Sequence, residues 1–233
     1  MHLFYAPDIR QNPVLPEEES AHAVRVLRLE AGESVVVLDG KGGVFEATIA
    51  LAHPKHCVLN SLQPLTPPTV RPYRLHIAIA PTKNMDRLEW FVEKAAEIGI
   101  DEISPVFCRF SERKVLKNER LQKILVSAMK QSKQAFLTQL NEPCPFKEFV
   151  GRAQADQKFI AHCHEADKRL LSHEIRKAAS VLVMIGPEGD FSEEEVELAL
   201  AKGYVPVSLG ETRLRVETAA LVACHTAALI NEL

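Results

Sequence analysis

The sequence has no long apolar run, which excludes the segments that most often attach a chain to a membrane. No stretch approaches the ~18–20 uncharged apolar residues that a transmembrane helix needs. The first residues, MHLFYAPDIRQNP, reach proline and charge before a signal-peptide apolar region can form. We therefore expect a cytoplasmic protein.

Cysteine is scarce, and its placement disfavours disulfides and zinc. The five cysteines are odd in number and widely separated, which indicates unpaired thiols in a reducing compartment. They are Cys57, Cys108, Cys144, Cys163 and Cys224. The adjacent residues His162, Cys163 and His164 lack the spacing of zinc ligands and fit a polar loop better. We expect no metal centre.

A positive net charge is also absent, and so are the common nucleotide-binding motifs. The net charge is -3, from 28 Lys and Arg against 31 Asp and Glu, so a nucleic-acid site would have to arise from local clustering. The chain contains no Gly-x-Gly-x-x-Gly, no Gly-Lys-Ser/Thr and no Gly-x-Ser-x-Gly pattern. An α/β enzyme acting on small nucleotides is therefore disfavoured.

What is present divides into two parts. Residues 1–70 predict a small β-barrel: residues 35–38 and 44–49 flank a glycine-rich turn and suggest a hairpin, and residues 57–60 suggest a further strand. Residues 17–29 have the spacing of a short helix that carries Arg25 and Arg28. Four prolines in residues 63–72 disfavour both helix and central strand and mark a linker. We therefore predict domains at 1–70 and 71–233.

From residue 75 onward, predicted strands alternate with predicted helices. This order is typical of an α/β domain with a mostly parallel sheet. The predicted strands are 75–80, 103–107, 159–161, 181–185 and 205–209. The predicted helices lie around 88–98, 117–136, 168–177, after a capping box of Ser192 and Glu195, and at 216–230.

Two loops follow the carboxyl ends of predicted parallel strands, where open α/β sheets usually bind ligands. The first, residues 185–191, has glycines that would let the backbone approach a ligand. A tight connection without a ligand explains it equally well. The second, residues 209–220, places Arg213, Arg215 and Glu217 at the start of a helix. It could be a solvated helix terminus, but arginines there oppose the helix dipole, which favours a functional role.

A basic segment between residues 109 and 133 is a candidate phosphate-binding surface. Eight basic residues stand there against Glu112 and Glu119 only, although the chain as a whole is acidic. A solvated helix face is the alternative. A patch of this kind would bind RNA phosphates without sequence specificity.

These residues resemble the ribosomal RNA small subunit methyltransferase E family, in the SPOUT superfamily of knotted methyltransferases. In the first part the similarity lies in residues 22–28 (HAVRVLR) and 38–40 (LDG). In the second it lies in residues 93–100 (EKAAEIGI), 185–189 (IGPEG) and 209–210 (LG) followed by 214–219 (LRVETA). The chain departs from the family pattern at Asp190, where members commonly carry a glycine, and at Thr212, where members usually carry an arginine and this chain has Arg213 one position later. Aspartate can adopt the left-handed conformation that a glycine would supply.

The resemblance implies a PUA-like RNA-binding β-barrel, a trefoil-knotted α/β domain, a homodimer and methylation of uridine N3 in 16S rRNA of the small ribosomal subunit with S-adenosylmethionine. For this chemistry we assign Arg215 to stabilising the uracil anion and Glu217 to orienting Arg215 or accepting a proton. The cofactor-binding candidates are Ile185, Gly186, Pro187, Gly189, Leu209, Gly210 and Leu214. The RNA-binding candidates are Arg25, Arg28, Arg109, Arg113 and Lys130. A non-catalytic RNA-binding or ribosome-assembly protein, and a SPOUT enzyme acting on tRNA or on a ribose hydroxyl, remain alternatives.

Overall fold

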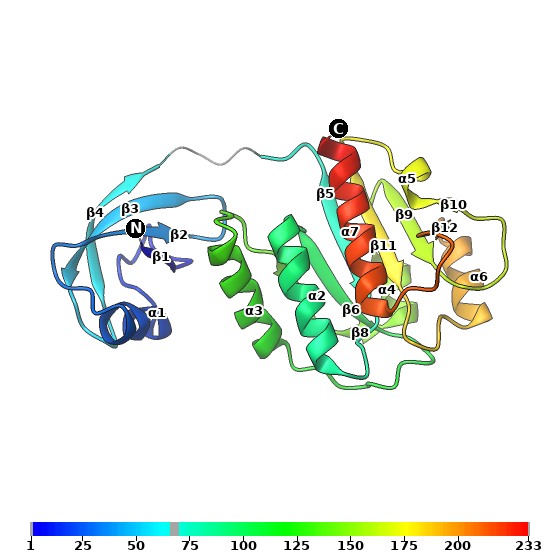
Figure 1. The fold of residues 1–233 in the computed structure, drawn as a ribbon, viewed down its shortest axis with the longest axis horizontal. Helices are drawn as coiled ribbons and strands as arrows, with labels where there is room; N and C mark the ends of the chain where they lie inside the picture. The colour runs from blue at the N-terminus through cyan, green and yellow to red at the C-terminus, as the bar shows by residue number, and fades with distance from the viewer. Residues whose placement is uncertain (1, 66–69, 233) are drawn as a thin grey trace. The chain divides into compact units, whose positions relative to one another are not determined.

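The computed structural model describes residues 2–65 and 70–232, which pack into two compact units (Figure 1). One unit consists of Met1–Val70 with Val126–Leu137, and the other of Arg71–Leu125 with Thr138–Leu233. Residues 126–137, which we had assigned to the second domain, thus pack with the N-terminal residues. Part of the expected linker, residues 66–69, lies outside the described residues. The domain limits 1–70 and 71–233 stay a prediction.

The first unit contains a four-stranded sheet in the order β1-β2-β3-β4. Its strands are β1 (His2–Tyr5), β2 (Ser34–Leu38), β3 (Val44–Leu51) and β4 (Val58–Pro64). The predicted hairpin is confirmed, because β2 and β3 pair antiparallel. Its turn is held by Asp39, whose Oδ1 accepts hydrogen bonds from the N–H groups of Lys41 and Gly43. A Cβ on Gly43 would lie 2.2 Å from Asp39 Oδ2, so this turn requires glycine there.

The predicted helix at 17–29 is only partly correct. Helix α1 (Glu17–Ala21) passes directly into a π-helical turn, η1 (His22–Val26). Arg28 then takes a left-handed conformation (φ 57°), which ends the helical segment. Such π-turns are rare, and the spacing of apolar residues does not distinguish them from an α-helix.

The second unit contains a parallel sheet in the order β10-β12-β9-β11-β5-β6-β7, with β8 also paired to β6. The strands are β5 (Arg74–Ile79), β6 (Glu102–Phe107), β7 (Gln139–Leu140), β8 (Cys144–Pro145), β9 (Gln157–Ala161), β10 (Arg169–Leu170), β11 (Ser180–Ile185) and β12 (Val205–Ser208). The predicted parallel α/β sheet is therefore confirmed. Strand β11 is central, and its continuous apolar sequence reflects burial on both faces.

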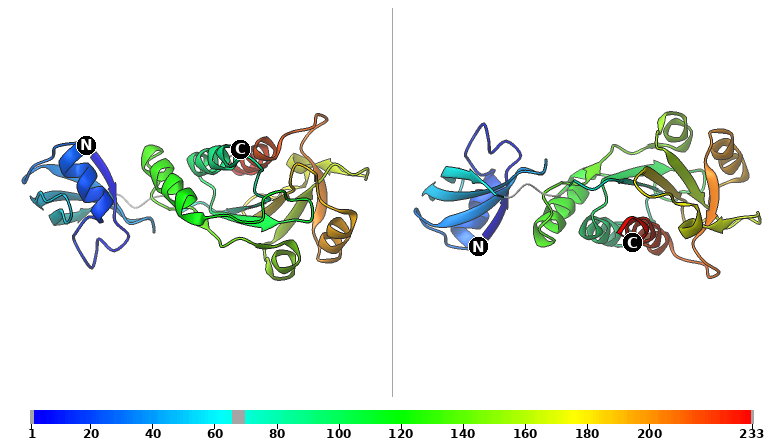
Figure 2. Two further views of the ribbon diagram at one scale, coloured as in Figure 1. Left: turned by 90° about the horizontal axis from the view of Figure 1, so that it is seen from below. Right: turned by 90° about the horizontal axis from the view of Figure 1, so that it is seen from above.

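Helices cover both faces of this sheet. Helices α2 (Met85–Ile98) and α7 (Val216–Glu232) lie on one face, and α4 (Phe146–Arg152) and α6 (Glu193–Ala201) on the other (Figure 2). Helix α2 ends at Gly99 in the left-handed conformation, and α6 begins with the predicted capping box of Ser192 and Glu195. The remaining helices are α3 (Asn118–Gln131) and α5 (Leu171–Glu174). None of the helices in the described part of the chain has both the length and the apolar character that crossing a bilayer requires.

Two predicted helices are shorter than expected. The helix predicted at 168–177 is reduced to the four residues of α5, because Arg169 and Leu170 pair with β12 as an edge strand. The helix predicted at 117–136 ends at Gln131. Lys133, just beyond it, has a left-handed φ of 57° that stops the helix.

A buried histidine lies in the sheet of the second unit. His76 on β5 is 9% exposed, and its Nε2 lies 2.8 Å from Ser104 Oγ. Burial lowers the pKa of His76 from 6.5 to about 4, and nearby Glu102 opposes this shift. The fold therefore holds this imidazole in its neutral form.

We expect the free energy of unfolding to decrease as the pH falls from 6.5 toward 4. The unfolded chain protonates His76 near pH 6.5 and the folded chain only near pH 4, so acid favours the unfolded state in that interval. Between about pH 7.5 and about pH 5 this one group accounts for about 2 kcal/mol. Urea unfolding at both pH values measures it. The variant His76→Gln should lose less stability over the interval, and equal losses in variant and wild type would contradict the assignment.

Candidate functional site

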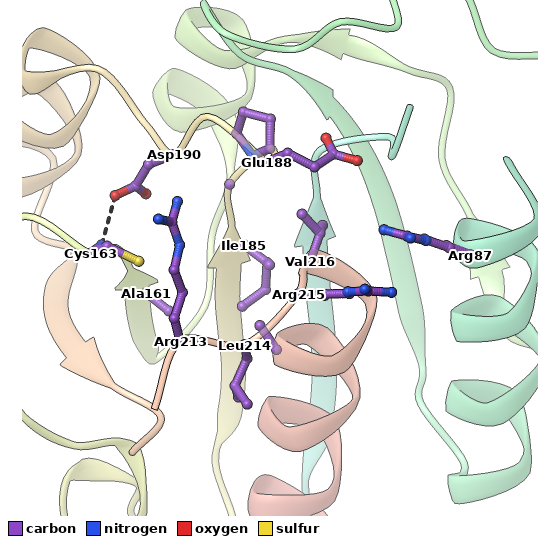
Figure 3. Close-up of a pocket in the computed structure, with 13 residues that line it drawn as sticks. Arg87, Ala161, Cys163, Ile185, Glu188, Asp190, Arg213, Leu214, Arg215 and Val216 are labelled. Atoms are coloured by element: carbon purple, nitrogen blue, oxygen red, sulfur yellow. Dashed lines mark hydrogen bonds between the residues drawn. The ribbon is translucent and has the colours of Figure 1, made fainter. Parts of the chain in front are cut away.

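The two predicted loops border adjoining cavities at the carboxyl edge of the parallel sheet (Figure 3). The loop at 185–191 follows β11, and the loop at 209–215 follows β12; β9 lies between these two strands. The larger cavity has a volume of about 430 Å³ and the smaller about 290 Å³. Both are lined by Ala161, Cys163, Arg213, Leu214 and Ala219. Loops far apart in the sequence thus form one continuous candidate site.

Most of the predicted cofactor-binding residues line these cavities. Ile185, Gly186 and Pro187 border the larger cavity, as does Arg215. Leu209 and Gly210 border the smaller one, and Leu214 borders both. Gly210 has a φ of 134°, and a Cβ there would meet no atom within 4 Å, so its backbone conformation is what favours glycine. Gly189 and Glu217 line neither cavity.

The glycines of the first loop make room for aromatic side chains of the protein. A Cβ on Gly186 would lie 3.0 Å from the ring of Phe191, and one on Gly189 would lie 3.0 Å from Phe110 Cβ. Phe191 is only 1% exposed and packs against Phe146, with 5.6 Å between ring centroids. We had expected both glycines to admit a ligand. A side chain at either position would press against one of these two phenylalanines, and Gly186 also lines the larger cavity, so a role in admitting a ligand stays a prediction.

Asp190 fixes the end of the same loop. Its φ of 67° confirms that aspartate adopts the left-handed conformation here. Its carboxylate accepts hydrogen bonds from the N–H of Cys163 (2.7 Å) and from its neighbour Phe191 (2.9 Å). Asp190 therefore joins the loop after β11 to the loop after β9.

Asp190→Ala is expected to destabilise the protein by about 1–3 kcal/mol. The change removes the acceptor for a cross-loop hydrogen bond and places alanine in a left-handed conformation that it disfavours. Asp190→Asn is the matched control, because asparagine tolerates this φ and retains an acceptor oxygen. Denaturant unfolding of both variants measures the difference. An alanine variant as stable as the asparagine variant would refute this role.

Arg215 and Glu217 lie at the start of α7 in different environments. Arg215 is exposed at the larger cavity, and its side chain has no hydrogen-bond or ion-pair partner among the described residues. Glu217 is 9% exposed, and its Oε1 lies 3.7 Å from Nε of Arg87 on α2. Its Oε2 is buried without a partner in the described part of the chain. The charged partner of Glu217 among the described residues is therefore Arg87, and its expected role in orienting Arg215 stays a prediction.

Arg87 is a site residue that sequence reasoning missed. It lines the larger cavity, and its side chain extends toward the same side of the pocket as that of Arg215 (Figure 3). Arg213 extends toward Asp190 and Cys163. Arg87 stands in the first turn of an ordinary amphipathic helix, so no local pattern marks it. Its partner Glu217 is distant in sequence, and only the packing of α2 against α7 brings them together.

A third loop, after β9, also belongs to the site. Ala161 and Cys163 line both cavities, and His162 lines the smaller one. We had interpreted residues 162–164 as a polar loop. Within the described residues, no group of three or more His, Cys, Asp or Glu side chains could hold a metal ion.

The predicted RNA-binding residues differ in whether their charge is free. Arg113 donates hydrogen bonds to the carbonyls of Thr82 (3.2 Å) and Lys83 (2.8 Å). Lys130 forms a 2.6 Å ion pair with Glu19 inside the first unit. The side chains of Arg25, Arg28 and Arg109 are exposed and form no hydrogen bond or ion pair within residues 2–65 and 70–232. Arg109 also lies over the ring of its neighbour Phe110, 5.9 Å from the centroid. These three are therefore the candidates whose charge is not held by a hydrogen bond or ion pair in the described part of the chain.

Comparison with known proteins agrees with this architecture. Residues 69–228 match the RNA methyltransferase domain family, and residues 15–60 match the RNA methyltransferase PUA domain. Ribosomal RNA small subunit methyltransferase E of Synechocystis sp. is 31% identical over 232 residues, which cover 95% of this chain and 75% of that protein.

Two solved structures are similar over nearly the whole chain. A protein of Porphyromonas gingivalis described as a probable rRNA-methyltransferase has 43% identity and a TM-score of 0.88, and the match covers 98% of this chain and 99% of that one. Ribosomal RNA small subunit methyltransferase E of Neisseria gonorrhoeae, solved with bound S-adenosylmethionine, has 25% identity and a TM-score of 0.83, with 99% and 98% covered. Family match, identity and fold agree, and the chain belongs to the ribosomal RNA small subunit methyltransferase E family of RNA methyltransferases.

Proposed function

We propose that this protein methylates N3 of a uridine in 16S rRNA of the small ribosomal subunit, using S-adenosylmethionine. The observation that carries the proposal is that three loops at strand ends surround two adjoining cavities. Arg215, whose guanidinium has no partner among the described residues, lines the larger of them. The family supplies the reaction class, and the Neisseria relative contains the same cofactor. The uridine-N3 position is inferred from the family alone.

The residues at the cavities fit S-adenosylmethionine. The larger cavity alone is within the ~300–1,000 Å³ that small-molecule sites occupy. Apolar side chains of Leu214 and Ala219, which line both cavities, suit the adenosine part, while main-chain groups of the loops offer hydrogen bonds. We assign cofactor binding to Ile185, Gly186, Pro187, Leu209, Gly210 and Leu214. We assign Gly189 to the packing of the loop, because a Cβ there would lie 3.0 Å from Phe110 Cβ.

The bound cofactor would supply an electrophilic methyl group, and the protein's own residues would prepare the uracil. N3 of uridine carries a proton at neutral pH, so that proton must leave before N3 can attack, and negative charge then spreads to the uracil oxygens. Arg215 is the side chain we assign to that charge, because it is cationic, exposed to the cavity and without another partner. Holding the base in line with the methyl group is the second requirement.

Arg87 and Glu217 act as positioning residues in this proposal. Glu217 is largely buried, and its ion pair with Arg87 places a second guanidinium beside the cavity. The unpaired Oε2 of Glu217 is our candidate acceptor for the N3 proton, reached through water because Glu217 lines neither cavity. Arg87→Ala would leave Glu217 buried and unpaired, so both substrate positioning and local stability depend on this pair.

We further propose that the exposed Arg25, Arg28 and Arg109 bind rRNA phosphates, with Arg113 and Lys130 contributing mainly to the fold. The N-terminal unit would act as the PUA-like RNA-binding domain, and the match of residues 15–60 to that domain supports this. A trefoil knot around the cofactor site, a homodimer and a cytoplasmic location complete the proposal, as the family resemblance implies.

Mass spectrometry of nucleosides from 16S rRNA tests the function. RNA from a strain that lacks this protein should have lost 3-methyluridine, and the purified protein with S-adenosylmethionine should restore it. Unchanged 3-methyluridine in that strain would refute the proposal. Loss of a methylated tRNA nucleoside would favour the tRNA alternative. Calorimetry with S-adenosylmethionine tests the non-catalytic alternative, which predicts no binding.

A further inference from the structure

His162 lines the smaller cavity, and its imidazole, 5.5 Å from the ring of His164 between centroids, has no hydrogen-bond partner among the described residues. His162 is 8% exposed, and both ring nitrogens, Nδ1 and Nε2, are buried without a hydrogen bond to any described residue. Its main chain is held in place, because Lys168 Nζ donates to the carbonyls of His162 and His164, each at 2.7 Å. The unpaired ring nitrogens are therefore not explained by a loosely held loop.

A buried polar group without a partner destabilises a fold, and such groups are rare in native proteins. Burial, together with the smaller effect of the neighbouring Lys168, lowers the pKa of His162 from 6.5 to about 4. The ring is therefore neutral at physiological pH and offers one N–H donor and one acceptor nitrogen. A ligand with both hydrogen-bonding functions would satisfy it.

Charge decides which part of the cofactor this cavity suits. Arg87 and Arg215 line only the larger cavity, beside Glu188 and Asp190, so this cavity offers separate cationic and anionic side chains that suit the carboxylate and the ammonium of the methionine part. The smaller cavity is formed largely by the chain from Val207 to Leu214, in which Glu211 and Arg213 are exposed, and the neutral His162 also lines it. Lys168, also at this cavity, already has two carbonyl partners. An uncharged group with donors and acceptors, such as a nucleoside, fits this environment.

We propose that His162 is a specificity-determining residue that hydrogen-bonds the nucleoside part of the bound cofactor. This inference rests on the proposed function, because it takes the ligand to be S-adenosylmethionine. His162 binds and does not take part in methyl transfer, since it lines the cavity that Arg215 does not reach. Its substitution should therefore change cofactor affinity and KM for the cofactor, while kcat at saturation stays within about twofold.

Calorimetry with two nucleosides tests the proposal. The probes are S-adenosylhomocysteine and 5′-methylthioadenosine, which share the nucleoside but differ in the amino-acid part. His162→Phe should weaken the binding of both about tenfold, as expected for one lost neutral hydrogen bond. His162→Gln, which keeps a donor and an acceptor, should recover part of the affinity. His173→Phe is the matched control, because His173 is exposed and lines neither cavity.

Three results would overturn the inference. They are unchanged affinity of both His162 variants, weaker binding of S-adenosylhomocysteine with normal binding of methylthioadenosine, and a fall in kcat without a change in KM. A melting curve of unliganded His162→Phe checks the fold; its Tm should not fall, because the change removes an unpaired buried polar group. If His162→Phe does not fold, the comparison of His162→Gln with His162→Leu decides. Wild-type affinity of a normally melting His162→Gln for both nucleosides then supports the inference only if His162→Leu binds both of them more weakly. Failure of the wild-type protein to bind either nucleoside would instead count against the proposed function.

Discussion

Arg215→Ala is expected to lower kcat for RNA methylation by about 10²- to 10³-fold, while the affinity for S-adenosylmethionine stays nearly unchanged. A preorganised cation that meets developing charge in a water-poor site contributes on this scale. Arg215 fits the role because its guanidinium lies at the larger cavity and is not used by another side chain of the described residues. Single-turnover assays with saturating cofactor measure the rate, and calorimetry measures the affinity.

Two further variants make the Arg215 test specific. Arg215→Lys keeps the charge but not the planar guanidinium, so it should restore only part of the rate. Arg152→Ala removes an exposed arginine paired with Glu148 on α4, remote from the cavity lining, and should leave the rate unchanged. Intact turnover by Arg215→Ala would remove Arg215 from the mechanism. A parallel loss of cofactor affinity would assign it to cofactor binding.

Phe191→Ala is expected to produce the largest loss of stability, about 3–5 kcal/mol, the usual range for deleting a buried aromatic ring. Phe191 is 1% exposed, packs against Phe146 and fills the space behind Gly186. For a chain of this size the loss corresponds to a fall in Tm on the order of 10 °C. Because the ring supports the loop that lines the larger cavity, cofactor affinity should fall as well. Urea unfolding and calorimetry measure the two effects.

Phe110→Ala is the matched control for Phe191. Phe110 packs against the other glycine of the loop, Gly189, but is 48% exposed. Its removal should destabilise the protein by less than half as much, because a half-exposed ring loses less buried area and leaves no closed cavity. Equal losses for the two variants would show that Phe191 does not support the loop in the way we infer.

Local patterns predicted the long elements well. The apolar strand at 181–185 and the helix ending at Gly99 are found as expected, because burial on both faces and a left-handed C-cap leave strong local signals. The shortest elements escaped prediction. Strands β7, β8 and β10 have two residues each, and their pairing depends on distant strands. Helix α4 has seven residues, too few for a clear period.

The candidate site was predicted in part. The predicted residues lie in loops with a recognisable local pattern, whereas the missed residues join the site through segments distant in sequence. The loops at 185–191 and 209–215 carry glycine, proline and arginine in patterns that can be recognised locally. Arg87 and His162 carry no such signal. Arg87 becomes a site residue through Glu217 on another helix, and His162 through its burial beside the loop after β12.

The sequence by itself determined the β domain followed by a parallel α/β domain, the family resemblance and the two glycine-bearing loops, since each is encoded by neighbouring residues. Only the tertiary structure decided what those loops contact. It placed Phe191 and Phe110 beside the glycines, paired Glu217 with Arg87 and left the ring nitrogens of His162 without a hydrogen bond to any described residue. These are contacts between segments brought together by the order of the parallel strands, and no local pattern carries the information that specifies them.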